Sequence, residues 1–385
     1  MPRENSQGRE IMPEVPVNGK VLVWAREIRG LDASSAAELL DITLEELAAY
    51  ESGSKKPLVG FLRLMSSKYQ INFTSLLMPA PLPIGERPVD HRSRARKRAL
   101  SIETLVAIEE VSESLEVFKD IASESRKLIP RLAIGTVDLK EDPEEVANRE
   151  RKRFGISLDE QRRWKSLGDA RRRWREHIED HGIFTYMIPM PLEEISGFSI
   201  LHDDIAAICV NDREPTEGAK TFTLFHEYCH LLLRQTGISD EDDSNAVEKF
   251  CNQFAGSFLI PRTNLAEAIE NVAIPHNFSV SAVRKLATRF KVSNRAMAFR
   301  LEETGLAPSG FYRTRTRLWD IPKQHEETTS KKQPSPVILR IKRLGRLHAS
   351  TVLSALDKKI INSFDASELI GLQPSVLPKV EARLG

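Results

Sequence analysis

Apolar residues in the first part of the chain recur three and four positions apart, as they do on the buried face of a helix. The pattern runs through residues 20–73, in the segments KVLVWAREIRG, SSAAELLDI, TLEELAAYESG and PLVGFLRLMSSKY. Ser34 and Thr43 stand where helix N-caps are expected. We predict a bundle of short helices over residues 18–77 that contains a helix-turn-helix unit, followed by a proline-rich linker over residues 78–98.

The pattern changes twice between residues 99 and 305. A long helical stretch comes first, and from residue 182 it gives way to three short runs typical of strands, GIFTYMI, GFSI and IAAICVN. Helical spacing then returns over residues 244 to about 259 and in a helical pair over residues 280–305. We predict an α+β fold for residues 99–305, mostly helical, with a small β-sheet.

The end of the chain predicts a second linker and a small helical segment. Residues 306–336 are mostly polar and contain several prolines, whereas residues 337–385 return to apolar positions at helical spacing. A chain of 385 residues is also long for a single core, because single cores rarely grow past about 250 residues. We therefore expect a multidomain protein.

Composition narrows the class of protein. Hydrophobic residues make up 41% and charged residues 29% of the chain, and no apolar run approaches the roughly 18 residues needed to span a bilayer. The N-terminus has no hydrophobic signal core. Three cysteines without a CxxC pair argue against a disulfide scaffold and against a thiolate zinc ribbon. We expect a cytoplasmic protein with no membrane partner.

The segment FTLFHEYCHLLL, residues 222–233, carries two histidines four positions apart in an otherwise apolar run. On a helix such residues share a face, so His226 and His230 can direct imidazole nitrogens to one ion, with Glu227 beside them. A catalytic zinc ion takes three protein ligands and one water, and a neighbouring carboxylate can accept the proton of that water. Buried polar groups without a metal or partner would be costly here. We predict a Zn²⁺ site rather than two buried structural histidines.

A third ligand is expected from the next helix. Glu248 shares a stripe with Cys251 and with further apolar positions, which puts its carboxylate on the core-facing side. Cys251 is a rival ligand on the same face, and Cys229 is a candidate for capping the metal in a resting state. Other rivals are the acids of the preceding loop, Asp240, Glu241, Asp242 and Asp243. We predict Glu248 as the ligand and small buried hydrophobes as the role of both cysteines.

The predicted set of residues implies hydrolysis of a peptide bond. Glu227 would remove the proton of the attacking water and return it to the leaving amine. Tyr228 and Tyr186 are candidates for completing the oxyanion site.

Basic residues cluster ahead of the predicted strands, with tryptophans interleaved. One explanation is a solvated helix face that is balanced by nearby Asp and Glu. Contact with nucleic acid stays open, because guanidinium groups neutralise phosphates and indoles can stack on bases. The formal net charge of +1 does not by itself indicate such a partner. The candidate contact residues are Arg162, Arg163, Arg171, Arg172, Arg173 and Trp174.

Several blocks of the sequence resemble the ImmA/IrrE metallopeptidases over roughly residues 140–305, in order and in residues. They are GIFTYMI, EISGFSI, AICVND, KTFTLFHEYCHLLL, VEKFCNQFAGSFLIP and ATRFKVSNRAMAFRL. The resemblance implies a zincin-like peptidase core within residues 99–305. It also implies that the zinc ligands are His226, His230 and Glu248. Glu227 is then the catalytic acid and base.

Residues 20–73 likewise resemble the XRE-type helix-turn-helix domain that is often joined to such peptidases. Family members typically cleave a helix-turn-helix repressor, which releases genes of the DNA-damage response, mobile elements or phage defence. The resemblance therefore implies an XRE-type repressor as the substrate.

One feature departs from a DNA-reading domain. The segment TLEELAAYESG presents Glu45, Glu46 and Glu51, and acidic side chains repel phosphates. Docking to the repressor or self-association is an alternative role for this domain, beside binding of duplex DNA.

Two functions remain open from the sequence. The first is a zinc endopeptidase that cleaves a partner repressor. The second is an XRE-type DNA-binding regulator whose peptidase-like domain is a sensor or scaffold. A further hypothesis is that single-stranded DNA, held by the Arg and Trp clusters, activates the peptidase.

Overall fold

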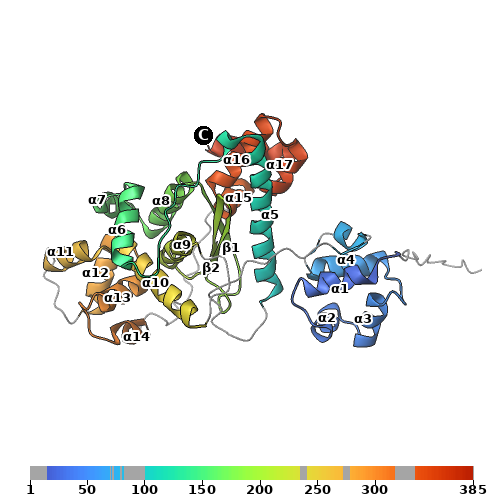
Figure 1. Cartoon of the computed structure of the whole chain (residues 1–385), viewed down its shortest axis with the longest axis horizontal. Coiled ribbons are helices and arrows are strands. Elements are labelled where there is room, and N and C mark those ends of the chain that lie inside the picture. The colour runs from blue at the N-terminus through green and yellow to red at the C-terminus, as the bar shows by residue number, and fades with distance from the viewer. Residues whose placement is uncertain are drawn as a thin grey trace, which may run out of the picture. The chain divides into compact units, whose positions relative to one another are not determined.

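The computed structural model describes residues 15–69, 71, 73–78, 80–81, 100–234, 241–271, 278–316 and 334–384 of the chain (Figure 1). Contacts divide the chain into two compact units. The first comprises residues 1–87 and 95–108, and the second residues 88–94 and 109–385.

The N-terminal unit is a small bundle of helices around its own core. Leu22, Leu47 and Leu62, which come from three different helices, are fully buried in this core. The predicted short helices are therefore present. Their bounds are α1 (Gly19–Glu27), α2 (Ala33–Leu40), α3 (Leu44–Glu51), α4 (Val59–Tyr69) and the 3-10 helix η1 (Phe73–Leu77).

One of the two predicted N-cap residues of this unit is confirmed, and the other is wrong. Thr43 caps α3 as predicted, because its side chain accepts a hydrogen bond from the N–H of Glu46 at 3.1 Å. The prediction of Ser34 as a cap is wrong. Asp32 caps α2 instead, accepting from the N–H of Ser35 at 2.7 Å. Both residue types are good caps, and the backbone decides between them: it is still extended at Asp32 and already helical at Ser34.

The second unit contains a three-stranded sheet with the order β1-β3-β2. Its strands are β1 (Ile183–Ile188), β2 (Gly197–His202) and β3 (Ile205–Asn211), at the predicted positions. β1 is parallel to β3, and β2 is antiparallel to β3. Every residue of β1 and β3 is buried, as expected for strands covered on both faces. The predicted α+β class is confirmed.

Helices surround this sheet. Helix α9 contacts β2, β3, α8 and α10, so it lies at the centre of the unit (Figure 1). The helices of this part of the chain are α5 (Ile102–Glu124), η2 (Arg126–Leu128), α6 (Pro143–Phe154), α7 (Leu158–Arg163), α8 (Leu167–Asp180), α9 (Glu217–Leu232), α10 (Glu241–Leu259), α11 (Arg262–Asn271), α12 (Val280–Phe290), α13 (Asn294–Glu303) and α14 (Phe311–Thr316).

The last helices of the chain pack against β1. They are α15 (Pro336–Leu344), α16 (Arg346–Asp357), α17 (Ser363–Ile370), η3 (Pro374–Val376) and α18 (Leu377–Leu384), and both α15 and α16 contact β1. Alternate residues of β1 point to opposite sides of the sheet. Phe184 stacks on Phe118 of α5, with ring centroids 4.3 Å apart, and Tyr186 meets His348 of α16. The C-terminal helices therefore cover one side of this edge strand.

A buried ion pair fixes the junction between α15 and α16. Arg175 of α8 donates to the carbonyl oxygens of Lys342 and Arg343 at the end of α15. Glu179, one turn further along α8, accepts from the N–H groups of Arg346 and Leu347 at 3.0 and 3.1 Å. The pair satisfies backbone groups that each helix end leaves without a partner inside the helix.

The two predicted linkers are described only in part. Of residues 78–98, only 78, 80 and 81 are described. The prediction of a linker from residue 306 is wrong for its first part, because α14 packs on α13 there and Phe311 is buried in the main core. Residues 317–333 lie outside the described residues. Across the described parts of the chain, no helix combines the length and the apolar character that crossing a membrane requires.

Candidate metal centre

Two imidazoles meet on one face of helix α9. The helix begins at the N-cap Thr216, whose side chain accepts from the N–H of Ala219. Ten residues on, His226 starts the last turns of the helix, and His230 follows one turn later. Both rings are buried, and their Nε2 atoms lie 3.0 Å apart. The helix thus directs two nitrogen donors to one point.

The carboxylate of Glu248 reaches the same point from α10. Its oxygens lie 3.3 Å from Nε2 of His226 and 3.2 Å from Nε2 of His230. Donors on a tetrahedral zinc ion, with bonds of about 2.0–2.1 Å, lie about 3.3 Å apart. The structure therefore brings the predicted ligands together at the spacing that one divalent ion requires.

Asn252 orients the first of these histidines. Its side-chain oxygen lies 2.9 Å from Nδ1 of His226, and because an amide oxygen only accepts, Nδ1 carries the proton. The lone pair of His226 is then on Nε2, toward Glu248 and His230. Sequence reasoning missed Asn252, although its position one turn after Glu248 on the same helix was a usable signal.

Strand β2 positions Glu227. Ser199 Oγ donates to Glu227 Oε2 at 3.3 Å, and the glutamate is 3% exposed. β2 approaches α9 closely at Gly197, where an added Cβ would lie 2.7 Å from Thr223 Cγ2 and 3.3 Å from Glu227 Cγ. No sequence signal marked Ser199, because its contact depends on how the strand packs on the helix.

The charge balance of the centre favours a bound cation. Burial of His230 opposes its protonation, but Cys251 and the carboxylates of Glu248 and Glu227 outweigh burial and raise its pKa to about 10. The same neighbouring groups that favour a proton on this ring would favour a metal ion in its place. Donor atoms of His226, His230 and Cys251 also lie within 4.8 Å of one another. The residues present therefore fit a divalent metal ion.

Both tyrosine candidates for the oxyanion site have other partners, which corrects that expectation. Tyr228 donates its hydroxyl hydrogen to Glu150 of α6 at 2.8 Å. The hydroxyl of Tyr186 lies 3.1 Å from Nδ1 of His348 on α16. Both side chains are fully buried. The rival acids of the loop are not placed: Asp240 lies outside the described residues, and the side chains of residues 241–245 are not described.

The proposed nucleic-acid residues do not form a stacking surface. Trp174 is fully buried and Trp164 is 4% exposed, and the two rings pack edge to face with centroids 4.9 Å apart. The prediction that Trp174 stacks on bases is wrong, because no base can reach it. Trp174 lies on the apolar face of helix α8, which packs on the core, whereas the candidate arginines of this helix lie outside that face.

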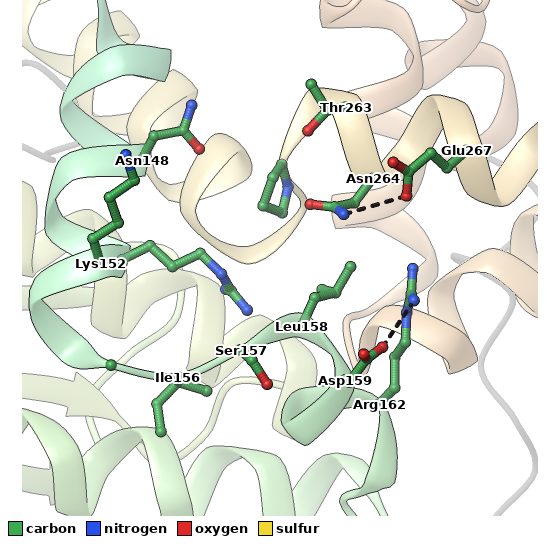
Figure 2. A pocket seen from close by; sticks show the side chains of 13 residues that line it. Asn148, Lys152, Ile156, Ser157, Leu158, Asp159, Arg162, Thr263, Asn264 and Glu267 are labelled. Carbon is green, nitrogen blue, oxygen red and sulfur yellow. Dashed lines mark hydrogen bonds and ion pairs between the residues drawn. The ribbon is translucent and has the colours of Figure 1, made fainter.

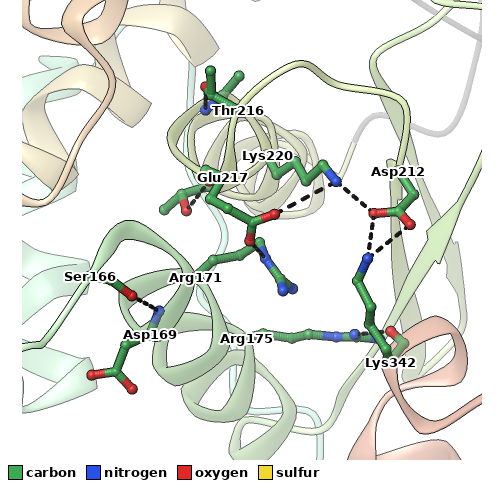
Figure 3. Close-up of polar contacts among 11 residues, drawn as sticks. Ser166, Asp169, Arg171, Arg175, Asp212, Thr216, Glu217, Lys220 and Lys342 are labelled. Atoms are coloured by element: carbon green, nitrogen blue, oxygen red, sulfur yellow. Dashed lines mark hydrogen bonds and ion pairs between the residues drawn. The ribbon is translucent and has the colours of Figure 1, made fainter. Parts of the chain in front are cut away.

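Most of the basic residues in this group have acidic partners. Arg162 pairs with Asp159, and Arg172 and Arg173 pair with Asp169. Arg171 pairs with Glu217 at the start of α9 (Figure 3). Arg163 is exposed. The pairing favours a solvated helix face over a phosphate-binding one.

The same region anchors the first turn of α9. Lys220 donates to Asp212 at 2.6 Å, and Lys342 of α15 donates to the same carboxylate at 3.0 Å (Figure 3). Burial raises the pKa of Asp212, but the two ammonium groups together outweigh it and hold that pKa below its usual value. These contacts fix the helix that carries the histidines to the end of β3.

A separate pocket lies between α6, α7 and α11 (Figure 2). Two pairs of its polar groups bond to each other: Arg162 with Asp159, and Asn264 with Glu267. None of the four predicted metal-centre residues lines it. The pocket is therefore distinct from the centre formed by α9 and α10.

Comparison with known families agrees with this site. Residues 178–302 match the model of a peptidase family, M78, that is described as the IrrE N-terminal-like domain. The matched stretch contains α9, α10 and all four predicted residues of the centre. The resemblance to the ImmA/IrrE family is confirmed for this part of the chain, whereas the N-terminal bundle lies outside the match. No match was found among curated proteins.

Proposed function

We propose that this chain, a member of the IrrE N-terminal-like peptidase family through residues 178–302, is a zinc-dependent endopeptidase that cleaves a helix-turn-helix repressor. The family match supports a metallopeptidase-type function. The observation that carries the finer proposal is the meeting of His226, His230 and Glu248 beside the buried carboxylate of Glu227.

The ligand set supports zinc as the metal. Two imidazole nitrogens and one carboxylate are a common set in catalytic zinc sites. A bound zinc ion lowers the pKa of its water to about 7 and polarises a carbonyl group. Asn252 keeps His226 in the tautomer that this role requires.

Glu227 is the acid and base in this proposal. Because it is nearly excluded from solvent, its carboxylate can exchange a proton with an attacking water without competition from bulk water. Ser199 holds Oε2 by a hydrogen bond of 3.3 Å, which limits rotation of the carboxylate. Glu227 takes the proton of the water and then delivers it to the leaving amine of the cleaved peptide bond.

The repressor is the proposed substrate because of the family resemblance and because of the N-terminal bundle. Helix α3 carries Glu45 and Glu46 in its first turn, and Lys55 is paired with Glu46. This charge pattern disfavours the alternative function, a DNA-binding regulator with an inactive peptidase-like domain. It favours a bundle that docks on another protein. In this proposal the protein acts in the cytoplasm. Cleavage of the repressor then allows transcription of stress, DNA-damage or phage-defence genes.

Substitution of Glu227→Gln tests the proposal. Purified wild-type and variant chains are loaded with zinc and incubated with a purified XRE-type helix-turn-helix repressor. We expect cleavage by the wild type and a loss of about 100-fold to 10,000-fold in the variant, since proton transfer by a placed side chain contributes about this much. Zinc content should stay the same, because Glu227 is not among the ligands.

The matched control is Glu193→Gln, which removes the same charge at an exposed position. It should cleave as the wild type does. Repressor loss that persists at the wild-type rate in Glu227→Gln would overturn the enzymatic proposal and leave the regulator as the better account.

A further inference from the structure

Helix α10 brings a second potential donor to the metal centre besides Glu248. Cys251 follows Glu248 by three residues, so the two side chains share a face of the helix. Its donor atom and those of His226 and His230 all lie within 4.8 Å of one another, and all three residues are buried. The three donor atoms are therefore close enough together to hold one ion.

The thiol of Cys251 lies between a metal ligand and another thiol. It lies beside the imidazole of His230 and beside the side chain of Cys229 on α9. Cys229 and Cys251 are both fully buried. The Cys251 thiol therefore lies between Cys229 and the metal centre. A change of its side-chain rotamer is enough to move the sulfur from one to the other.

We propose that Cys251 is a fourth protein ligand of the metal ion, which gives the centre a closed form and an open form. This rests on the proposed function, since it concerns the same ion. In the closed form the donors are His226, His230, Glu248 and Cys251, and in the open form water replaces the thiol. Four protein ligands are typical of inert zinc sites, and three with a water are typical of catalytic ones.

The exchange is a balanced ligand substitution. On closing, the S–H bond of Cys251 breaks, the sulfur binds the ion, and one proton and one water molecule leave to solvent. On opening, Cys251 takes back a proton and returns to Cys229. No electron is transferred in either direction. The closed form holds the peptidase inactive until the thiol is displaced.

Cobalt substitution tests the proposal without reference to peptidase activity. Co²⁺ reports on its ligands through d–d absorption in the visible range, and a bound thiolate adds a charge-transfer band in the near ultraviolet. The full chain is stripped with a chelator and loaded with Co²⁺. We expect both absorptions in the wild type, and loss of the charge-transfer band with retention of the d–d bands in Cys251→Ser.

Matched variants make the result specific. Cys209→Ser removes another fully buried cysteine, on β3, and should keep the band. Cys251→Ala repeats the test without a hydroxyl, and the thermal unfolding midpoint of each variant identifies any that fails to fold. Against a repressor that the wild type cleaves, Cys251→Ser should cleave faster, because it cannot close.

The outcomes separate the two proposals. If the wild type shows d–d bands without a charge-transfer band, Cys251 is not a ligand, and the proposed function stands. If the band persists in both Cys251 variants, another cysteine is the donor and the assignment is overturned. If Co²⁺ does not bind to the wild type at all, the metal centre and both proposals fail.

Discussion

Acidification should selectively loosen the contact between the C-terminal helices and the sheet, through His348. This side chain is fully buried on α16. Its Nε2 lies 3.0 Å from the carbonyl oxygen of Leu369, which only accepts, so Nε2 carries the proton. Nδ1 then accepts from the hydroxyl of Tyr186 at 3.1 Å. The neutral ring makes both hydrogen bonds. A second proton would have to go on Nδ1, where it would displace the hydrogen bond from Tyr186.

The size of the effect follows from the pKa of His348. Burial lowers it to about 4, and the positive charge of Arg340 adds to this although the carbonyl of Leu369 opposes it. A histidine in an unfolded chain has a pKa of about 6.5. Because the folded pKa is the lower one, the unfolded state binds the extra proton first. The stabilisation is therefore complete above about pH 6.5 and is lost as the pH falls toward about 4. Linkage gives a loss of about 2 kcal/mol between about pH 7.5 and about pH 5.

Hydrogen exchange read out by peptide mass is the suitable assay, because it reports on α16 separately from the rest of the chain. After correction for the intrinsic pH dependence of exchange, the opening free energy of α16 should fall by about 2 kcal/mol on acidification to about pH 5. Because glutamine does not bind a proton in this pH range, the loss of opening free energy between about pH 7.5 and about pH 5 should disappear in His348→Gln. His202→Gln leaves His348 in place and should behave as the wild type. Equal losses in wild type and His348→Gln would refute the reasoning.

Three further predictions concern the metal centre and its supports. Asn252→Ala should weaken zinc binding by about 10-fold to 100-fold in a chelator competition, because His226 loses the partner that fixes its tautomer; unchanged affinity would contradict this. Gly197→Ala should lower the thermal unfolding midpoint and the cleavage rate together, since its Cβ would collide with Thr223 at 2.7 Å, and a fully active variant would show that β2 can move away. Removal of the metal with a chelator should abolish cleavage and lower the unfolding midpoint, both restored by added zinc, and no change in either would count against a bound ion.

The arrangement within single elements was predictable from local sequence. The spacing of His226 and His230 puts both rings on one face of any helix, and the three strands were visible as short apolar runs between turn residues. Glu248 was predictable in the same way, as an acid on the apolar stripe of the next helix. Residue type and period are properties of a few neighbouring positions, so the sequence carries them without knowledge of the fold.

Contacts between elements were predicted less well. Trp174 was a candidate for contact with nucleic acid and is a core residue. Tyr186 was a candidate for the oxyanion site and bonds to His348, which lies 162 residues away in the chain. Ser199 gave no signal, although it holds Glu227 across 28 residues. Each of these depends on which helix packs on which strand.

Residue types and their spacing were thus enough to predict the donors of the candidate centre, the helices that carry them and the α+β class. Folding of the whole unit was needed to show which side chains orient those donors, which arginines are neutralised, and that Cys251 comes within reach of the two histidines. The two kinds of feature depend on different distances along the chain. Helical and strand periods are set by backbone geometry over a few residues, whereas a contact between distant residues exists only after the buried faces of several elements have found one common packing.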